Sequence, residues 1–336
     1  MPNLLLAVAN TRPVRASISA LPISRRLVDR FIAGEDQAAA IAVTRGLIAE
    51  GLTVTLDVLG EGVTDPAGAA ANATAYQKLL AALAETGLTA GAEVSVKLSA
   101  LGQALPGDGQ AIALEHAARI AAAAASAGTT MTLDMEDHTT VDSTLGVLRE
   151  LRTEYPWVGA VLQSALRRTE GDCRDLATAG SRVRLVKGAY AEPASVAYPR
   201  KPDVDAAYRR CLEVLMAGDG YPMIATHDLA LVGAARQLAA RHGRSRESWE
   251  LQMLHGIRTD ELRALAADGV AVRVYLPFGT DWYGYYVRRL AERPANLLFL
   301  LRHLRAGKTS EGKSGAGKSG TSKTSASKTS ADASAN

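Results

Sequence analysis

The sequence predicts a (βα)8 barrel of the TIM type, preceded by helices and followed by a disordered tail. Eight β-branched apolar runs of strand length alternate with eight helical stretches rich in Ala and Leu. The runs are nearly continuous in apolar residues, which is typical of parallel strands covered on both faces. Eight such units in about 250 residues match the size of this barrel. A doubly wound open sheet is the main alternative, but it rarely uses so many uniform units.

A helical extension, residues 1–51, is expected ahead of the barrel. A short helical segment from Arg25 to Ala33 ends at Gly34, and a second helix from Ala38 to Glu50 ends at Gly51. Glycine after a helix adopts the left-handed conformation without steric cost, so both helices have an ordinary stop signal.

The barrel is expected to span residues 52–306. Its strands are predicted at Thr53–Val58, Val94–Leu98, Met131–Met135, Gly159–Leu162, Val183–Val186, Pro222–Ala225, Trp249–Met253 and Ala271–Leu276. The helices that follow them are predicted at Pro66–Glu85, Gln110–Ala127, Thr140–Tyr155, Gly171–Ala179, Asp203–Ala217, Leu229–His242, Thr259–Asp268 and Asp281–Arg305.

Composition indicates a cytoplasmic globular protein. Of 336 residues, 47% are hydrophobic and 22% are charged, which is enough for a large core. No apolar run approaches the roughly 20 residues that span a bilayer. Leu4–Ala9 is too short for a signal peptide and no cationic region precedes it. The two cysteines, Cys173 and Cys211, lie on different predicted helices, which suits a reducing compartment.

The segment 307–336 repeats lysine among Ser, Thr, Gly and Ala, and we expect it to be disordered. Its five lysines exceed its two acidic residues by three, which equals the net charge of the whole chain, +3. The remaining chain is therefore neutral, and no specific nucleic-acid-binding face is expected on the barrel. One alternative function is a non-catalytic module whose tail binds nucleic acid or membrane.

Polar residues stand at or just after the end of every predicted strand, where a barrel of this type builds its active site. The set is rich in cations and amides and contains no metal-binding pattern such as HExxH, so no metal is expected. In chain order these residues are Asp57 with Glu61, Lys97, Asp134 with Glu136, Gln163, Arg184 with Lys187, His227 with Asp228, Gln252, and Tyr275.

The helix after the last strand carries Tyr285, Arg288 and Arg289 on one face, because the tyrosine lies three and four residues before the arginines. Two adjacent guanidinium groups repel each other unless an anion lies between them. A planar carboxylate fits the guanidinium fork, so this face predicts a carboxylate-binding site.

Several of these segments resemble the proline dehydrogenase family, in the same order along the chain. The resemblance covers residues 25–305, and RLVKGAY together with YxxRR is specific to the family. The segments are Arg30-Phe-Ile-Ala-Gly-Glu35, Leu56–Glu61, Ser95–Ser99, Leu133–Glu136, Val161–Gln163, Arg184–Tyr190, Ala225–His227, Gln252–Leu254, Tyr275-x-Pro-x-Gly279 and Tyr285-x-x-Arg-Arg289.

The resemblance implies a distorted (βα)8 barrel that binds FAD without a Rossmann fingerprint. It also implies oxidation of L-proline to Δ1-pyrroline-5-carboxylate by hydride transfer to the flavin, the first step of proline catabolism. Members of the family pass the electrons to a membrane quinone. The resemblance therefore implies peripheral contact with the inner face of the cell membrane.

The resemblance further implies roles for individual residues. For the substrate, Lys97, Arg288 and Arg289 hold the carboxylate, while Tyr275 and Tyr285 pack on the pyrrolidine ring. For catalysis, Asp134 is the active-site carboxylate, Arg184 lies by the flavin N5, Glu61 closes a gate with Arg288, and Glu292 supports the arginines. For the cofactor, the binding residues are Met135, Gln163, Arg184, Lys187, Gly188, Ala189, Thr226 and His227.

Two further functions remain open at this point. Lys97 or Lys187 at a strand end is suited to forming a Schiff base, as in a barrel lyase. A related cyclic amine such as hydroxyproline is the other alternative substrate. Because Arg184 and Lys187 are three residues apart, they point to opposite faces of a regular strand. Lys187 must therefore lie at the end of its strand or beyond it. Residues 191–202, with three prolines, form either a stiff cover over the cofactor or a surface loop.

Overall fold

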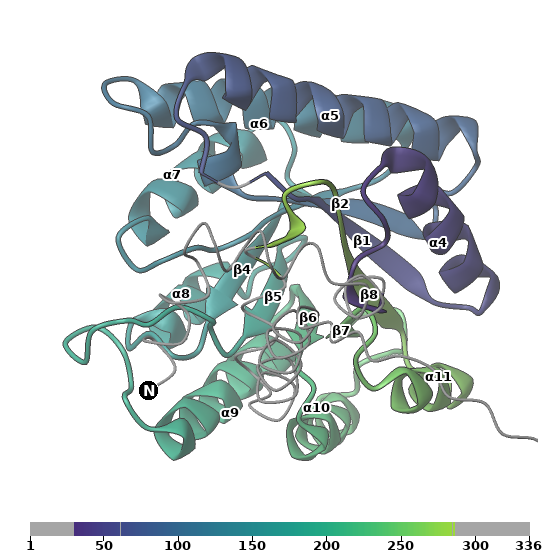
Figure 1. Ribbon diagram of the computed structural model, residues 1–336. Helices are drawn as coiled ribbons and strands as arrows, with labels where there is room; N and C mark the ends of the chain where they lie inside the picture. The colour runs from purple at the N-terminus through teal and green to yellow at the C-terminus, as the bar shows by residue number, and fades with distance from the viewer. Residues whose placement is uncertain (1–29, 61, 284, 286–336) are drawn as a thin grey trace, which may run out of the picture. The chain divides into compact units, whose positions relative to one another are not determined.

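Eight parallel strands close into a barrel in sequence order, with β8 pairing to β1 (Figure 1). The computed structural model describes residues 30–60, 62–283 and 285. The predicted (βα)8 barrel is therefore confirmed. The strands are β1 (Thr53–Val58), β2 (Ala92–Val96), β3 (Met131–Leu133), β4 (Gly159–Gln163), β5 (Arg182–Val186), β6 (Tyr221–Ala225), β7 (Glu250–Leu254) and β8 (Val272–Phe278).

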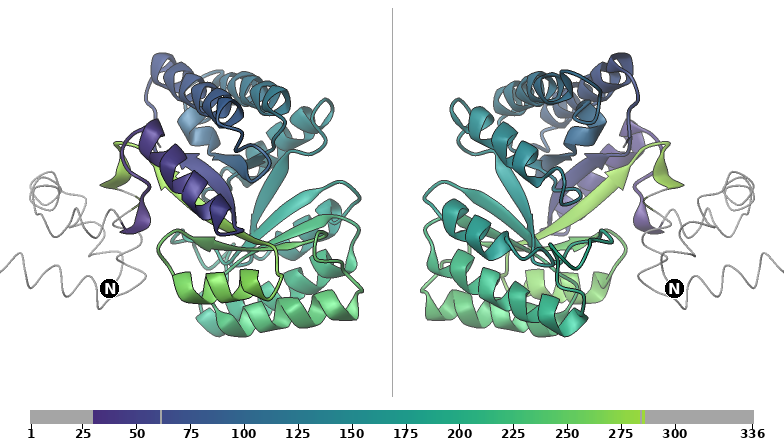
Figure 2. Two further views of the ribbon diagram at one scale, coloured as in Figure 1. Left: turned by 90° about the vertical axis from the view of Figure 1, so that its right-hand side faces the viewer. Right: turned by 90° about the vertical axis from the view of Figure 1, so that its left-hand side faces the viewer.

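Helices surround these strands on the outside, as the two side views show (Figure 2). The helix that precedes the barrel, α4, packs against β1 and β8. The helices are α4 (Gln37–Ala49), α5 (Pro66–Glu85), α6 (Gly109–Ala127), α7 (Val141–Arg152), α8 (Thr169–Leu176), α9 (Lys201–Ala217), α10 (Leu229–Arg241) and α11 (Thr259–Ala267), with a 3₁₀ turn, η1 (Leu98–Leu101), after β2.

Helix starts follow the residues that cap them. The carboxylate of Asp36 accepts the Ala39 backbone N–H at 2.8 Å and begins α4. Asp65 does the same for α5 through the N–H of Gly68, at 2.9 Å. Each cap satisfies a backbone donor that lacks a partner inside the helix.

Most element boundaries differ from the predictions by one to three residues, and three of these differences show a local feature of the chain. Strand β2 ends at Val96, and Lys97 is the N-cap of η1. Helix α9 begins at Lys201, before Pro202, since proline is tolerated in the first helical turn. Strand β8 continues through Pro277, which needs no N–H partner there, and its carbonyl accepts the backbone N–H of Ala33 at 2.9 Å.

Most of the predicted 25–33 helix, most of the predicted 281–305 helix and all of the 307–336 tail lie outside the described residues. Within the described part, Arg30 and Phe31 are helical, so this helix ends two residues before the predicted Ala33. Gly34 has φ +86° but does not directly follow the helix.

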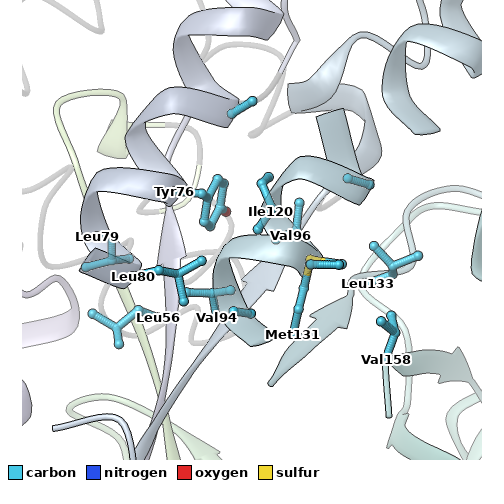
Figure 3. Packing of buried hydrophobic residues seen from close by; sticks show 14 of the residues in the cluster. Leu56, Tyr76, Leu79, Leu80, Val94, Val96, Ile120, Met131, Leu133 and Val158 are labelled. Carbon is cyan, nitrogen blue, oxygen red and sulfur yellow. The ribbon is translucent and has the colours of Figure 1, made fainter. Parts of the chain in front are cut away.

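Apolar strand side chains pack against the surrounding helices and form the core (Figure 3). Around α5 and α6, Leu56, Val94 and Val96 of the strands meet Leu80 and Ile120 of the helices, and each of these five is fully buried. A second cluster packs β4–β8 against α8, α9 and α10. The core therefore lies between the strands and the helices.

Polar side chains fill the inside of the barrel, which corrects the prediction of near-continuous apolar strands. Contacts between strands that are not neighbours reveal the inward direction, for example Glu93 of β2 with Arg182 of β5 at 2.7 Å. The inward residues recur at every second position, as the pleat of a strand requires. They include Thr53, Thr55 and Asp57 of β1, Glu93 and Ser95 of β2, Arg182 and Arg184 of β5, Glu250 and Gln252 of β7, and Arg273 and Tyr275 of β8.

Substituting Leu80→Ala should destabilise the protein by about 2–5 kcal/mol, because the fully buried side chain leaves a cavity in the core. The matched control is Leu229→Ala, since Leu229 is 46% exposed and its loss should change stability by less than about 0.5 kcal/mol. Urea unfolding of both variants measures the difference. Equal effects of the two substitutions would contradict the packing described here.

Candidate active site at the carboxyl ends of the strands

Asp134, directly after β3, is the residue on which several strands converge. Its Oδ1 accepts hydrogen bonds from Arg184 NH1 at 2.7 Å and Ser95 Oγ at 2.8 Å. Its Oδ2 accepts the hydroxyl of Tyr275 at 2.6 Å and lies 3.5 Å from Lys97 Nζ. These contacts join four strands at one carboxylate. We use "central cluster" for Asp57, Lys97, Asp134, Arg184 and Tyr275.

Asp134 is ionised at neutral pH. Burial alone would raise the pKa of this carboxyl group, but Lys97 and Arg184 outweigh it, helped by hydrogen bonds from Tyr275 and Ser95, and hold the pKa below its usual value of 3.8. Burial raises the pKa of the Tyr275 hydroxyl well above 10, and the nearby Asp134 charge adds to the effect. Tyr275 is therefore a neutral hydrogen-bond donor.

Lys97 lies just past β2 and connects the cluster to β1. Its Nζ contacts Asp57 Oδ2 at 2.6 Å and the hydroxyl of Tyr275 at 3.3 Å. The same ammonium lies 5.9 Å from the centroid of the Tyr275 ring, and Arg184 Cζ lies 5.4 Å from it. Two cations therefore flank one aromatic ring, where the ring quadrupole attracts them.

Arg184 is 2% exposed and is held by hydrogen bonds on several sides. Its Nε donates to Gln252 Oε1 at 2.6 Å, while NH1 serves Ser95 and Asp134. NH2 makes longer contacts, 3.5 Å to Thr55 Oγ1 and 3.5 Å to Glu93 Oε1. The guanidinium plane is thus fixed by the barrel itself.

A second layer of charges lies beneath the central cluster, and sequence reasoning missed it. Glu93 pairs with Arg182 at 2.7 Å, and Glu250 pairs with Arg273 at 2.8 Å. Burial alone would raise the pKa of Glu93, but Arg182, Arg273 and Arg184 outweigh it and hold the pKa well below its usual range. The sequence did contain a signal for this layer. Glu93 lies two positions before Ser95 and Glu250 lies two positions before Gln252, and residues two apart share one face of a strand.

The four charges of the central cluster cancel, because Lys97 and Arg184 balance Asp57 and Asp134. These four groups therefore do not attract an anion on balance. The sequence assigns two further cations to this site, Arg288 and Arg289, and both lie outside the described residues. The predicted gate residue Glu61 and the predicted support residue Glu292 also lie outside them. Tyr285 is within the described part and is 6% exposed.

Residues predicted to bind the cofactor gather at the ends of β4, β5 and β6. Lys187 lies one residue beyond β5, as the spacing from Arg184 requires, and its Nζ contacts Asp205 at 2.6 Å and Asp228 at 3.2 Å. Gly188 has φ +109°, and a Cβ there would lie 3.1 Å from Gln163 Oε1. The Gln163 side chain donates from Nε2 to the Glu136 carbonyl at 2.6 Å.

The remaining predicted cofactor residues surround this group. His227 Nε2 accepts the backbone N–H of Leu254 at 3.0 Å, so the proton of the neutral ring lies on Nδ1. Thr226 and Met135 are each 7% exposed, whereas Gly188 and Ala189 are exposed. Left-handed Gly188 exposes its backbone, and the donors beside it are an ammonium, an imidazole and an amide. Together with the Arg184 guanidinium on β5, this donor set fits a flavin dinucleotide, with the amide and the guanidinium for the ring and the ammonium for the phosphates.

Comparison with known proteins identifies the family. The model of the family described as proline dehydrogenase matches residues 40–302. The chain belongs to the proline dehydrogenase family. It is similar to proline dehydrogenase of Deinococcus radiodurans, with 42% identity over 283 residues covering 84% of this chain and 91% of the relative. It is also similar to proline dehydrogenase 2 of Bacillus subtilis, with 38% identity over 279 residues covering 83% of this chain and 90% of the relative.

A solved structure supports the same assignment. Proline utilization A from Bdellovibrio bacteriovorus, inactivated by N-propargylglycine, superimposes with a TM-score of 0.75 and 26% identity. The match covers 87% of this chain and 34% of that longer chain. The family, the oxidoreductase class and a role in proline metabolism follow from these comparisons.

The proline-rich segment 191–202 is tied to its neighbours on two sides. Tyr198 N–H donates to the Ala165 carbonyl at 2.8 Å, and Ala197 forms a bridge with Leu166 after β4. Glu192 contacts the His138 ring at 2.5 Å, in the loop after β3. These contacts connect this segment to the loops that follow Gln163 of β4 and Asp134.

No metal or membrane-spanning feature occurs in the part of the chain that the structure describes. Across residues 30–60, 62–283 and 285, no group of His, Cys, Asp and Glu is arranged to hold a metal ion. No helix in the same ranges is both long and apolar enough to cross a bilayer.

Replacing Asp134 by Asn should destabilise this proline dehydrogenase by about 3–5 kcal/mol at pH 7, because Lys97 and Arg184 lose a buried counter-charge. The folded-state pKa of Asp134 is depressed, so its contribution to stability is complete above the unfolded value and is lost as pH falls through the folded value. Urea unfolding measures the free energy of unfolding of the wild type and of the variant. The difference between the two should stay constant as pH falls from 7 and should narrow only in acid. A difference that grew as pH fell would contradict the ionised state of Asp134.

Proposed function

We propose that this proline dehydrogenase oxidises L-proline to Δ1-pyrroline-5-carboxylate with FAD as cofactor and passes the electrons to a quinone. The observation that carries the proposal is the central cluster, in which Asp134, Arg184, Lys97 and Tyr275 meet at the carboxyl ends of the strands. These are the positions at which the resemblance in sequence expects the reacting substrate.

Charge balance assigns the substrate carboxylate to residues beyond the described part of the barrel. Because the central cluster is neutral, Arg288 and Arg289 supply the net positive charge, and Lys97 adds a third donor. Two adjacent guanidinium groups are well matched to one carboxylate. Tyr275 and Tyr285 then pack on the pyrrolidine ring, and Glu61 and Glu292 act on the arginine pair as gate and support.

The reaction transfers a hydride, which is the hydrogen of a C–H bond with its electron pair, from the carbon next to the ring nitrogen to the electron acceptor. The ring nitrogen releases a proton to solvent, which leaves a C=N double bond. The amine must therefore be neutral when the C–H bond breaks. An excess of nearby positive charge disfavours its protonated form. Because the central cluster is neutral, Arg288 and Arg289 supply that excess. Asp134 holds the two cations of the central cluster and the Tyr275 hydroxyl in fixed positions, so little reorganisation accompanies the reaction.

FAD, when bound, supplies the acceptor for the electron pair. Gln163 and Arg184 are suited to the isoalloxazine ring, and Met135, Lys187, Gly188, Ala189, Thr226 and His227 to the rest of the cofactor. Because Arg184 Nε and NH1 are used within the barrel, this arginine contributes its positive charge more than a further short hydrogen bond. A donor charge at this position stabilises negative charge on the reduced ring.

The Schiff-base alternative is weakened by the partners of its two lysines. Lys97 pairs with Asp57, and Lys187 pairs with Asp205 and Asp228. A carboxylate partner favours the protonated ammonium, whereas a Schiff-base lysine needs a neutral amine. A secondary amine substrate also agrees with the N-propargylglycine that inactivates the Bdellovibrio protein, since that compound is a secondary amino acid. The tail alternative concerns residues 307–336, which lie outside the described residues.

The first test is the visible spectrum of the purified protein under anaerobic conditions, before and after addition of L-proline. We expect a flavin spectrum that bleaches with L-proline, and reoxidation when a soluble quinone is added. The same experiment with hydroxyproline at matched concentration distinguishes L-proline from the alternative cyclic-amine substrate. A protein without flavin that cannot be reconstituted with FAD would overturn the cofactor assignment.

Arg288→Ala and Arg289→Ala should each raise KM for L-proline by at least about 30-fold, since loss of one buried partner of a carboxylate costs about 2 kcal/mol or more. Flavin absorbance should be retained, because neither residue is assigned to the cofactor. Arg263→Ala is the matched control, since its guanidinium contacts Glu50 on the protein surface. Unchanged proline kinetics in both site variants would refute the carboxylate assignment.

A further inference from the structure

Residues 30–35, ahead of the barrel, lie beside the end of β8. This segment contacts the last residues of that strand and the residues that follow it. Ala33 N–H donates to the Pro277 carbonyl at 2.9 Å, and Gly279 N–H donates back to the Gly34 carbonyl at 3.1 Å. Three residues later, the Trp282 indole Nε1–H donates to Glu35 Oε1 at 3.0 Å. Residues 33–35 therefore run alongside residues 277–282, from the end of β8 to the start of the helical turn at Trp282.

Glycine residues allow this close approach. Gly256, with φ +72°, would place a Cβ 1.8 Å from the Arg30 carbonyl oxygen. Gly279, with φ +128°, would place one 3.2 Å from the Leu59 carbonyl oxygen. A side chain at Gly256 would push the segment aside, and one at Gly279 would press on Leu59, just after β1. Arg30 also donates from Nε to the Gly256 carbonyl at 3.1 Å, so the segment is held at both of its ends.

Trp282 begins the helical turn that contains Tyr285. Trp282 is 9% exposed and Tyr285 is 6% exposed, whereas Glu35 lies at the surface. A buried indole N–H normally has a hydrogen-bond partner, and a carboxylate acceptor makes that bond charge-assisted. Residues three apart on a helix share a face, so the direction of Trp282 sets the direction of Tyr285.

We propose that Glu35 is a positioning residue for substrate binding, which acts through Trp282 on the helix that carries Tyr285. The proposal rests on the function proposed above, in which Tyr285 and the two arginines after it bind L-proline. Glu35 itself contacts no substrate. Its hydrogen bond fixes the angle at which the chain leaves β8, and so the distance between the helix and the central cluster.

Glu35→Ala should raise KM for L-proline about 5- to 20-fold and leave kcat nearly unchanged. The expected loss is smaller than the roughly 100-fold that a displacement of 1 Å can cause. Glu35→Gln should recover most of the affinity, because its amide oxygen still accepts the indole N–H. Trp282→Phe should match Glu35→Ala, and the double variant should be no worse than either, since both remove the same bond. Glu50→Ala, which removes a surface carboxylate at the other end of α4, is the control and should retain wild-type kinetics.

A second measurement tests the contact without substrate. The chain has three tryptophans, so ¹⁵N-labelled indole groups of the full-length protein give three signals, and Trp282→Phe assigns one of them. That signal should shift in Glu35→Ala and return toward its original position in Glu35→Gln. A wild-type KM in Glu35→Ala, or an indole signal that does not move, would overturn the proposal. Absence of proline oxidation by the wild type, with the indole shift present, would overturn the proposed function and leave the contact established.

Discussion

The ion pair between Arg184 and Asp134 joins β5 to the end of β3 across the inside of the barrel, with 2.7 Å between nitrogen and oxygen. Removing either partner would leave a buried charge, which typically costs 3–5 kcal/mol. Gln252, Tyr275 and Lys97 each contact one of the two groups and Ser95 contacts both, so their positions depend on the same pair. The geometry of the site is therefore set by the closed barrel and not by its loops.

The inside of this barrel is unusual because charge, and not branched apolar side chains, fills it. Four carboxylates and four cations form the ion pairs of the described interior: Asp57 with Lys97, Glu93 with Arg182, Asp134 with Arg184, and Glu250 with Arg273. Since the charges balance within each pair, the interior tolerates them at low dielectric. The positive charge that we propose for Arg288 and Arg289 would then attract an anion without competition from an unbalanced carboxylate of this interior.

The order and the approximate limits of the strands were predictable because eight apolar runs alternated with helical stretches. The inward network was harder to predict, since it depends on which residues meet across the barrel. Ser95 and Glu93 show this well, because each is ordinary in a strand. They become part of the network only through Asp134, after the neighbouring β3, and through Arg182 and Arg184 on β5 across the barrel. Alternation in Glu93-x-Ser95 and Glu250-x-Gln252 was the available signal. Lys187 was predictable in place, just beyond β5, but its two aspartate partners come from α9 and the start of α10 and are not apparent from local sequence.

The contacts of residues 30–35 also bear on where a truncated form of this protein should begin. Strand count alone would begin the barrel at residue 52, and the family match begins at residue 40. Either boundary would discard Glu35, Gly34 and Ala33, which hydrogen-bond to the chain leaving β8. A truncated gene designed from either boundary would still encode all eight strands. Its product would lack the residues that hydrogen-bond to the chain after β8. The smallest functional unit therefore begins before α4 and before the first strand of the barrel.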